Sequence, residues 1–283
     1  MSTHISLVMG TLGDQKIDRF LRHLVRQNET QGVELIVVDQ NDHDHVKQVL
    51  KTYKNQLKIK HLRADPGLSH ARNVGLNHVT GDLVAFPDDD CWYPEGLLER
   101  VKCFFDQNPE WHGLTGRSLD ADGAPSSGRW DRTSGPLRKG NVWTRAISYT
   151  IFLRRKVVSS VGEFDERLGV GAGTPWGSGE ETDYLLRSLR EGWKLWYDPE
   201  IVVHHPSKTQ GYGVDSQKRA YAYGVGMGFV LRKNRCVNSF VYFLVRSLGG
   251  MIFGLSRFNI REVRFFYSSF LGRLKGYFRR ENI

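Results

Sequence analysis

The chain has 283 residues, of which 40% are hydrophobic and 25% are charged. This composition is ordinary for a globular protein, and the length suffices for one large domain with an appendage. Three cysteines without C-x-x-C spacing argue against a disulfide framework or a zinc site, and indicate a reducing compartment. No basic region followed by a long apolar run stands at the N-terminus, so we predict no signal peptide.

The net charge of +9 is unevenly distributed along the chain. Residues 206–283 hold 14 Lys or Arg and 3 Asp or Glu, whereas residues 1–205 hold 26 and 28. The sequence therefore predicts two parts: a near-neutral domain over residues 1–206 and a basic, aromatic-rich helical tail over residues 207–283.

Short apolar segments alternate with helical patterns along the first hundred residues. Strands are predicted at 5–9, 34–38, 58–62 and 83–86, and helices at 14–28, 45–55 and 69–78. This alternation is typical of an α/β fold with a mostly parallel sheet that is covered on both faces. Ligands bind such sheets beyond the carboxyl ends of the strands. Thr11, Asp39 and Asp88 follow three of these strands, so we expect them to share one crevice.

The periodicity weakens between residues 108 and 178. Residues 120–140 are rich in Gly, Ser, Asp and Arg, which predicts a long loop. A helix is predicted again at 182–191, followed by strands at 193–197 and 200–203, and Pro206 ends the pattern.

Three carboxylates, Asp88, Asp89 and Asp90, follow the strand at 83–86 directly. They repel one another unless a divalent cation lies among them, and Mg²⁺ and Mn²⁺ prefer such hard oxygen ligands. Mg²⁺ completes its shell with waters and substrate phosphates, so the triplet favours a phosphate-bearing substrate. The alternative is an Asp-rich entry to a helix, with Asp90 as the N-cap.

Three other polar residues stand in positions where a ligand could reach them. Asp39 could accept a hydrogen bond from the N–H of a base, or could simply start a turn. Arg72 lies in the first turn of a predicted helix, where backbone N–H groups favour anions, although a solvated arginine is the simpler interpretation. His205 could complete a mixed Asp/His site with the triplet, or could be a hydrogen-bonded core residue.

The segment 176–183 places Glu180, Glu181 and Asp183 at the start of a predicted helix, after Trp176 and two glycines. Acidic residues in a first turn complement the helix dipole, which would be a purely structural role. The functional interpretation is a general base at the mouth of the helix, with Trp176 as a wall beside it.

Taken in order, these motifs resemble the family 2 glycosyltransferases with a GT-A fold. The resemblance rests on Asp39, on segments 67–73, 86–90 and 179–183, and on His205; segment 161–169 also resembles that family's Gly-Phe-Asp-Glu turn. It covers residues 4–206, and although each motif is short, five occur in the right order. The resemblance implies a Rossmann-like sheet and direct, inverting transfer of a sugar from a nucleotide diphosphate, most simply a UDP-sugar.

The resemblance also implies a role for each matching residue. Asp88 and Asp90 match the ends of an Asp-x-Asp motif that bridges metal and diphosphate, and His205 matches a distal metal ligand. The cofactor would be Mn²⁺ or Mg²⁺. The implied nucleotide-sugar-binding residues are Thr11, Asp39, Arg72, Asp88 and Asp89.

Glu181 matches the position of the catalytic base, but the sequence departs from the family pattern there. The family usually has Glu-Asp, whereas this chain has Glu180 followed by Glu181. The extra carbon–carbon bond displaces the carboxylate enough to matter for a positioned base, so Glu180 and Asp183 remain candidates. Trp176, Glu180 and Asp183 are the implied acceptor-binding residues.

The tail predicts helices with one apolar and one basic face. Val263, Phe266 and Phe270 recur at helical spacing, with basic residues on another face, a pattern typical of helices in a membrane interface. Residues 236–256 come nearest to a spanning segment, but Arg246 divides them, which favours a shallow placement. The alternatives are a helical cap on the catalytic domain and nucleic-acid binding, for which no signature motif is present.

The combined expectation is a cytoplasmic enzyme attached peripherally to the inner face of the cell membrane, extending a lipid-linked glycan in cell-surface polysaccharide assembly, with no nucleic-acid partner. A nucleotidyltransferase is an alternative, but it should carry a basic, Gly-rich loop after the first strand. Residues 9–14 contain no basic residue. A non-catalytic membrane-bound scaffold is the other alternative, and the intact acidic triplet argues against it.

Overall fold

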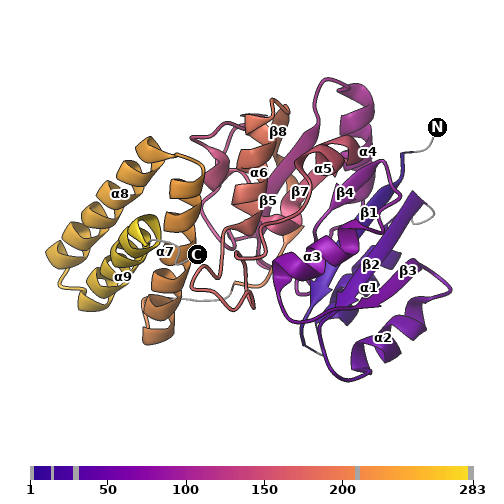
Figure 1. Ribbon diagram of the computed structural model, residues 1–283, viewed down its shortest axis with the longest axis horizontal. Coiled ribbons are helices and arrows are strands. Elements are labelled where there is room, and N and C mark those ends of the chain that lie inside the picture. Colours follow the sequence, from indigo (N-terminus) through magenta and orange to yellow (C-terminus); the bar gives the residue numbers. More distant parts are fainter. Residues whose placement is uncertain (1–2, 14–15, 28–31, 208–210, 280–283) are drawn as a thin grey trace.

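The computed structural model describes residues 3–13, 16–27, 32–207 and 211–279. In these ranges one sheet of eight strands runs in the order β3-β2-β1-β4-β7-β5-β8-β6 (Figure 1). The strands are β1 (Ile5–Thr11), β2 (Val33–Asp39), β3 (Lys58–Arg63), β4 (Leu83–Ala85), β5 (Gly113–Leu119), β6 (Gly135–Pro136), β7 (Ile151–Arg154) and β8 (Leu195–His204). Strands β3, β2, β1 and β4 are mutually parallel, as are β5 and β8, whereas β7 and β6 run antiparallel to their neighbours. The predicted α/β class with a mostly parallel sheet is confirmed.

Helices cover both faces of the sheet. They are α1 (Ile17–Val25), α2 (His45–Tyr53), α3 (Leu68–Leu76), α4 (Leu97–Gln107), α5 (Arg155–Val161) and α6 (Glu180–Arg190), with short 3-10 turns η2 (Val142–Thr144) and η3 (Ser148–Thr150). Because side chains alternate along a strand, Leu7 and Met9 of β1 join a core with α1, α2 and α4. Val8 joins the opposite core, with α3, α5 and α6. Burial on both faces explains why these strands are almost continuously apolar.

The weak periodicity of residues 108–178 hides regular elements that the sequence analysis did not locate, although residues 120–134 form the predicted loop. Strands β5 and β7 lie centrally in the sheet there, and α5 follows β7. The cause is close packing: a Cβ atom on Gly116 would come within 1.9 Å of the Ile201 carbonyl oxygen. Because no side chain fits between β5 and β8 at this position, β5 carries glycine there. Its glycine and polar residues explain why β5 lacks the apolar pattern of a buried strand.

Strand β8 is a single strand where two were predicted. The pairing of β5 with β8 shifts register between Thr115 and Arg117, so residues 198–201 form an irregularity opposite Gly116. Pro199 lies in this irregularity, where its missing N–H breaks no ladder hydrogen bond.

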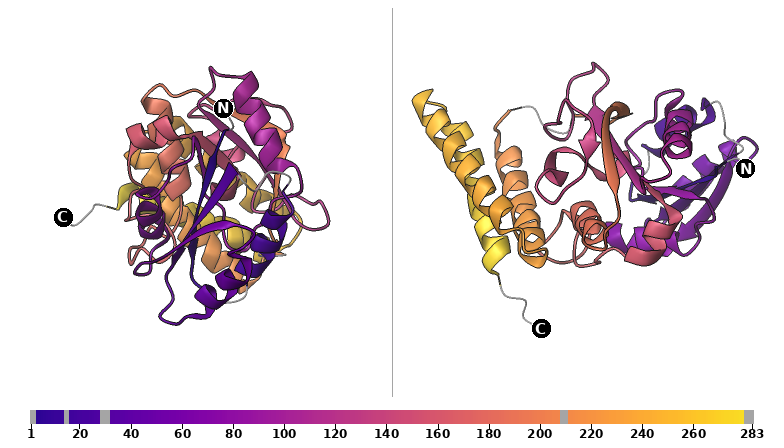
Figure 2. Two further views of the ribbon diagram at one scale, coloured as in Figure 1. Left: turned by 90° about the vertical axis from the view of Figure 1, so that its right-hand side faces the viewer. Right: turned by 90° about the horizontal axis from the view of Figure 1, so that it is seen from above.

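Three helices form a layer beyond the sheet: α7 (Val214–Lys233), α8 (Val237–Ser256) and α9 (Ile260–Phe278). Helix α7 joins the core through Val225 and Phe229, and α8 joins it through Phe240 and Phe243. Helices α8 and α9 lie on the side of α7 that faces away from the sheet (Figures 1 and 2). Helices α7 and α9 approach closely because glycines face each other, and a Cβ atom on Gly276 would lie 1.9 Å from the Val225 carbonyl oxygen. The fully buried residues of α9 are Glu262, Ser269, Gly272 and Gly276. Val263, Phe266 and Phe270, which the sequence analysis expected at a membrane interface, are half-buried.

Helix α8 is long and apolar enough to cross a membrane, judged by length and composition alone, and it is the one such helix among the described residues. Only 22% of its most apolar window is buried against the rest of the protein. Its outward face is therefore apolar and uncovered.

The glycine contact between α7 and α9 yields a stability prediction. Gly276→Ala should lower the free energy of unfolding by about 1–3 kcal/mol, because the added methyl must push the helices apart. Gly249→Ala in α8 is the matched control: no atom lies within 4 Å of the added carbon. That variant should be neutral or more stable, since alanine favours a helix over glycine by about 1 kcal/mol. Urea unfolding measures both, and equal stabilities for the two variants would contradict the contact.

Candidate functional site

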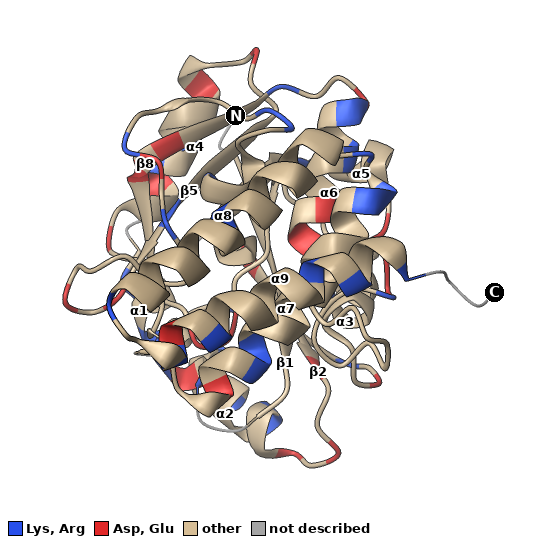
Figure 3. Cartoon of the chain, turned by 90° about the vertical axis from the view of Figure 1, so that its left-hand side faces the viewer, with Lys and Arg blue, Asp and Glu red and all other residues tan. Residues whose placement is uncertain are grey.

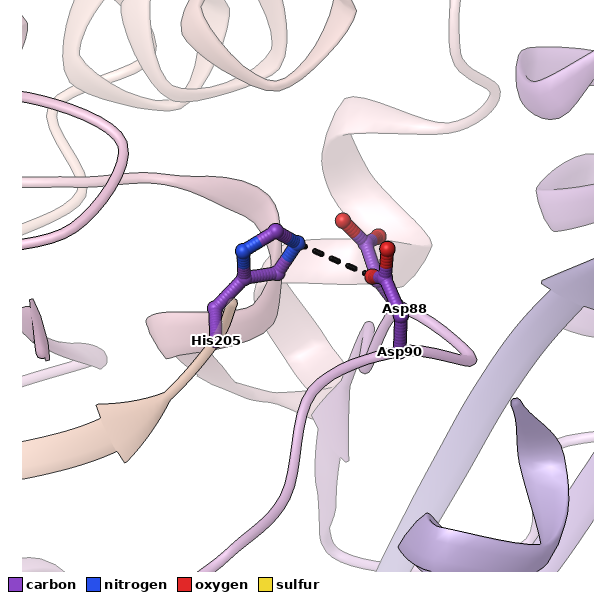
Figure 4. Close-up of side chains that lie close together, drawn as sticks. All are labelled: Asp88, Asp90 and His205. Atoms are coloured by element: carbon purple, nitrogen blue, oxygen red, sulfur yellow. Dashed lines mark ion pairs between the residues drawn. The ribbon is translucent and has the colours of Figure 1, made fainter. Parts of the chain in front are cut away.

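Two acidic residues after β4 meet a histidine from the end of β8. One possible ligand atom from each of Asp88, Asp90 and His205 lies within 4.8 Å of the others (Figure 4). The segment after the triplet is held there by Trp92, which exchanges backbone hydrogen bonds of 2.9 and 3.0 Å with His204. The Trp92 and His204 rings also stack, with centroids 5.1 Å apart. This bridge brings together residues that are more than a hundred positions apart.

The donor set of this cluster fits a divalent cation. His205 Nδ1 lies 2.7 Å from the Pro206 carbonyl, and donation to that oxygen leaves a lone pair on Nε2. Nε2 is buried and lies 2.9 Å from Asp90 Oδ1, yet no aligned hydrogen bond reaches it. Two atoms with lone pairs this close require either a proton or a cation between them. Two carboxylates and one imidazole suit Mn²⁺ or Mg²⁺.

A buried arginine joins this cluster to helix α6. Arg72 is 1% exposed; its Nη2 donates to Asp88 Oδ1 at 3.2 Å, and its Nη1 donates to Glu180 Oε1 at 3.0 Å. Ser148 also donates to Asp88, at 3.3 Å. The interpretation of Arg72 as a solvated residue is therefore wrong. Its charge balances carboxylates from two segments that are distant in sequence.

The middle residue of the triplet turns toward the end of β1. Asp89 accepts a hydrogen bond of 2.7 Å from Thr11 Oγ1. Burial raises the pKa of Asp89 to about 6, and repulsion from Asp90 and Asp88 adds to this, whereas the Thr11 hydrogen bond lowers it. Thr11 and the triplet thus lie at the same edge of the sheet, as the sequence analysis expected.

Asp39 ends β2 directly beside Thr11, its partner in the parallel register. The carboxylate is fully buried and lies 2.9 Å from His61 Nε2 and 3.4 Å from Arg63 Nη1. The backbone and side-chain N–H groups of Asn41 donate to it at 3.0 and 2.8 Å. Asp39 therefore lies at the expected edge, with an oriented carboxylate.

Helix α6 begins at the site with two adjacent glutamates in different environments. Gly179 adopts a left-handed conformation (φ +90°) and starts the helix. Glu180 is buried and ion-paired with Arg72. Glu181 is half-buried, and no side chain among the described residues holds its carboxylate. Burial raises the pKa of Glu181, and repulsion from Glu180 raises it further, whereas Arg72 lowers it.

The other two predicted acceptor residues face the C-terminal helices. Trp176 is 7% exposed and stacks on Phe229 of α7, with ring centroids 4.1 Å apart. Asp183 is fully buried and accepts hydrogen bonds from Arg187 at 3.1 Å, Lys233 at 2.8 Å and Asn234 at 2.8 Å. Asp183 thus links α6 to the end of α7 and is not brought to the Asp88–Arg72 cluster. Its acceptor role stays a prediction.

Sequence reasoning missed several residues at the site. Ser148 contacts Asp88, Tyr149 stacks on the His205 ring with centroids 4.8 Å apart, and Lys16 lies 3.4 Å from Asp90. Ser148 and Tyr149 belong to the segment without periodicity, so no pattern pointed to them. Lys16 lies just beyond the loop at 9–14 that was searched for a basic residue.

Comparison with known proteins identifies the family. A family model described as glycosyl transferase family 2 matches residues 6–161, more than half of the chain. The chain therefore belongs to glycosyl transferase family 2.

Individual relatives agree with this assignment. The chain is 25% identical over 192 residues to the glycosyltransferase AglE of Haloferax volcanii, covering 66% of this chain and 60% of AglE. It is 26% identical over 219 residues to the succinoglycan biosynthesis protein ExoM of Rhizobium meliloti, covering 72% and 67%. The alignment thus spans less than two thirds of AglE.

A solved structure supports the fold. The mannosyltransferase PcManGT of Pyrobaculum calidifontis, in complex with GDP-Man and Mn²⁺, superposes with a TM-score of 0.66. The match covers 99% of this chain and 89% of that protein, at 14% sequence identity. The similarity confirms the GT-A architecture.

The burial of Asp183 yields a second prediction. Asp183→Asn should lower the free energy of unfolding by about 3 kcal/mol, because the partners of a buried carboxylate lose their counter-charge. Lys233 is partly exposed and can reach solvent, so the loss should not exceed this value. Asp122→Asn, on an exposed loop, is the control and should change stability little. An unchanged stability in Asp183→Asn, measured by urea unfolding, would contradict the structural role.

Proposed function

We propose that this protein is a metal-dependent, inverting glycosyltransferase that moves a sugar from a nucleotide-diphosphate donor to an acceptor hydroxyl. One observation carries the proposal. Arg72 connects a cluster suited to a cation and diphosphate, through Glu180, to the start of the helix that bears Glu181. This connection would hold a site for the leaving group and a candidate base at a set distance from each other.

The donor would lie along the carboxyl edge of the sheet. Asp39 would accept from the N–H of the nucleobase in exchange for a hydrogen bond from Asn41, with Thr11 beside it, and Arg72 and the triplet would face the diphosphate. The expected UDP-sugar stays a prediction; the similar mannosyltransferase structure holds GDP-Man. Asp88, Asp90 and His205 would hold Mn²⁺ or Mg²⁺, and the bound ion would neutralise charge that develops on the departing diphosphate.

Glu181 would act as the general base. Of the three carboxylates considered, Glu180 is ion-paired with Arg72, and Asp183 is held by Arg187, Lys233 and Asn234. Glu181 has no such partner within the part of the chain that the structure describes, and its raised pKa brings it closer to the pH of the cell, which suits proton transfer. It would accept the acceptor's hydroxyl proton while the oxygen attacks the anomeric carbon and the diphosphate leaves from the opposite face.

The acceptor would be a lipid-linked glycan at a membrane surface, in cell-surface polysaccharide assembly. Two features support this: the uncovered apolar face of α8 and the similarity to a succinoglycan biosynthesis protein. Trp176 and Glu180 would border the acceptor. We further propose a cytoplasmic location, with the helical layer of α8 and α9 resting on the inner membrane face.

Glu181→Gln should lower the rate of sugar transfer by about 10²–10⁴-fold, because general-base catalysis contributes that much. Donor binding, measured by calorimetry with the nucleotide sugar, should change little. In the unmodified protein the rate should rise with pH through the raised pKa of Glu181, since only the deprotonated form accepts a proton. The variant should lose this pH dependence.

Glu181→Asp is the matched control for that experiment. It keeps the carboxylate but withdraws it by one carbon–carbon bond, so its rate should lie between those of the unmodified protein and Glu181→Gln. Full activity in Glu181→Gln would refute the base assignment.

Chelation should abolish transfer, and added Mn²⁺ should restore it. Asp90→Asn and His205→Ala should each weaken Mn²⁺ binding by at least about tenfold, because each removes a proposed ligand. Electron paramagnetic resonance titration of free Mn²⁺ measures this in the presence of a nucleotide diphosphate. Asp122→Asn serves again as the control, and full activity with a chelator in excess would contradict metal dependence.

A further inference from the structure

Two arginines in the outer helical layer have no acidic partner among the described residues. Arg273 of α9 is half-buried, and its hydrogen bonds go to neutral groups of α7 and α8. Nε donates to Met227 Sδ at 3.4 Å, and Nη1 donates to the Phe243 carbonyl at 3.3 Å and to Ser247 Oγ. No acceptor for Nη2 is found in the described part of the chain, so part of this guanidinium is left for another ligand.

Arg246 of α8 brings a second positive charge to the same place. It lies between Phe243 and Ser247 in the helix, and it is exposed. Burial lowers the pKa of Arg273 to about 10, and the nearby charge of Arg246 contributes. Two like charges close together, one of them desolvated, are costly unless an anion joins them.

The surroundings of this pair are apolar and uncovered. Figure 3 looks onto the outer layer, where the ribbon of α8 is almost entirely tan, and Arg246 is the single charged residue in its sequence. The exposed large apolar side chains of this helix include Val241, Tyr242, Val245, Leu248, Ile252, Phe253 and Leu255. Arg246 follows Tyr242 by one turn and precedes Gly250, which packs on Phe266 of α9. The pair therefore borders the apolar face on the side toward α9.

We propose that Arg246 and Arg273 form a binding site for the phosphate of an anionic membrane lipid, whose acyl chains contact the apolar face of α8. Guanidinium groups bind phosphate oxygens through paired N–H donors, and an apolar face beside them fits a lipid better than a free anion. The charge supports the same ligand, because residues 206–283 carry 14 basic and 3 acidic residues. This inference deepens the membrane location proposed above and adds a specific headgroup contact.

The site differs from general attraction to a charged surface. Diffuse attraction contributes a similar amount for every exposed basic residue near a membrane. A phosphate held between two guanidinium groups depends on these two positions and on the planar fork of arginine. Both differences can be measured.

The test compares vesicle binding by the full chain and its variants. Vesicles of phosphatidylcholine alone are compared with an equal mixture of phosphatidylcholine and phosphatidylglycerol, and bound protein is measured by co-sedimentation. Arg246→Gln should weaken binding to the anionic vesicles by about tenfold or more, whereas Arg264→Gln, an exposed arginine of α9, should weaken it by no more than about fivefold. Equal losses in the two variants would overturn the site.

Two further variants separate the headgroup contact from charge and from the apolar face. Arg246→Lys keeps the charge without the fork, so it should bind anionic vesicles more weakly than the unmodified protein. Unchanged binding in Arg246→Lys would overturn the site.

Ile252→Glu, on the apolar face, should reduce binding to both kinds of vesicle. Unchanged binding in this variant would show that acyl chains do not contact the apolar face. Arg273→Gln should resemble Arg246→Gln; if it does not fold, the Arg246 variants decide the matter.

Other occupants of this surface give different results. In one case, inorganic phosphate stabilises the unmodified protein but not Arg246→Gln, and the two proteins bind vesicles equally. This result would assign the site to a soluble anion and overturn the lipid. In another case, the unmodified protein sediments as a dimer that Ile252→Glu dissociates, with no binding to vesicles. That result would assign the apolar face to a second copy of the chain and overturn the lipid. Mn²⁺ and nucleotide-sugar binding are measured on the same samples. If the protein binds Mn²⁺ and the nucleotide sugar but not vesicles, the lipid site is overturned while the proposed catalytic function is retained.

Discussion

The site depends on one buried guanidinium. Arg72 is almost wholly removed from water and would be unstable there without partners, and Asp88 and Glu180 would repel each other without it. Each charge is tolerated only because the others are present. The segment after β4, helix α3 and the start of α6 are thereby held together, so the cluster of Asp88, Asp90 and His205 lies near the helix start that bears Glu181.

The same helix α6 couples this cluster to the C-terminal layer. Its first turn carries Asp183, whose partners Lys233 and Asn234 end helix α7, while Trp176 stacks on Phe229. Helix α9 then packs on α7 through glycines, and α8 covers part of α9. A continuous chain of buried contacts therefore connects the proposed base with the surface proposed to meet the membrane, and the tail is a packed part of the fold.

Sequence patterns located the parts of the site that follow regular, apolar elements. The strands that end at Thr11, Asp39 and the triplet are apolar because both faces of the sheet are covered, so their ends could be placed and a common edge inferred. The segment around β5 could not be placed in this way. Its glycines are dictated by neighbours such as Ile201, which come from distant sequence and leave no local period.

The sequence by itself determined the alternation of strands and helices, the acidic triplet and the order of the family motifs, because these depend on local periodicity and spacing. Tertiary structure alone decided which charges neutralise one another. It placed Arg72 in the interior and paired Asp183 with Lys233 and Asn234. It left Glu181 without a side-chain partner among the residues described. Such pairings join residues tens to more than a hundred positions apart, and their free energy depends on burial, which no local pattern encodes.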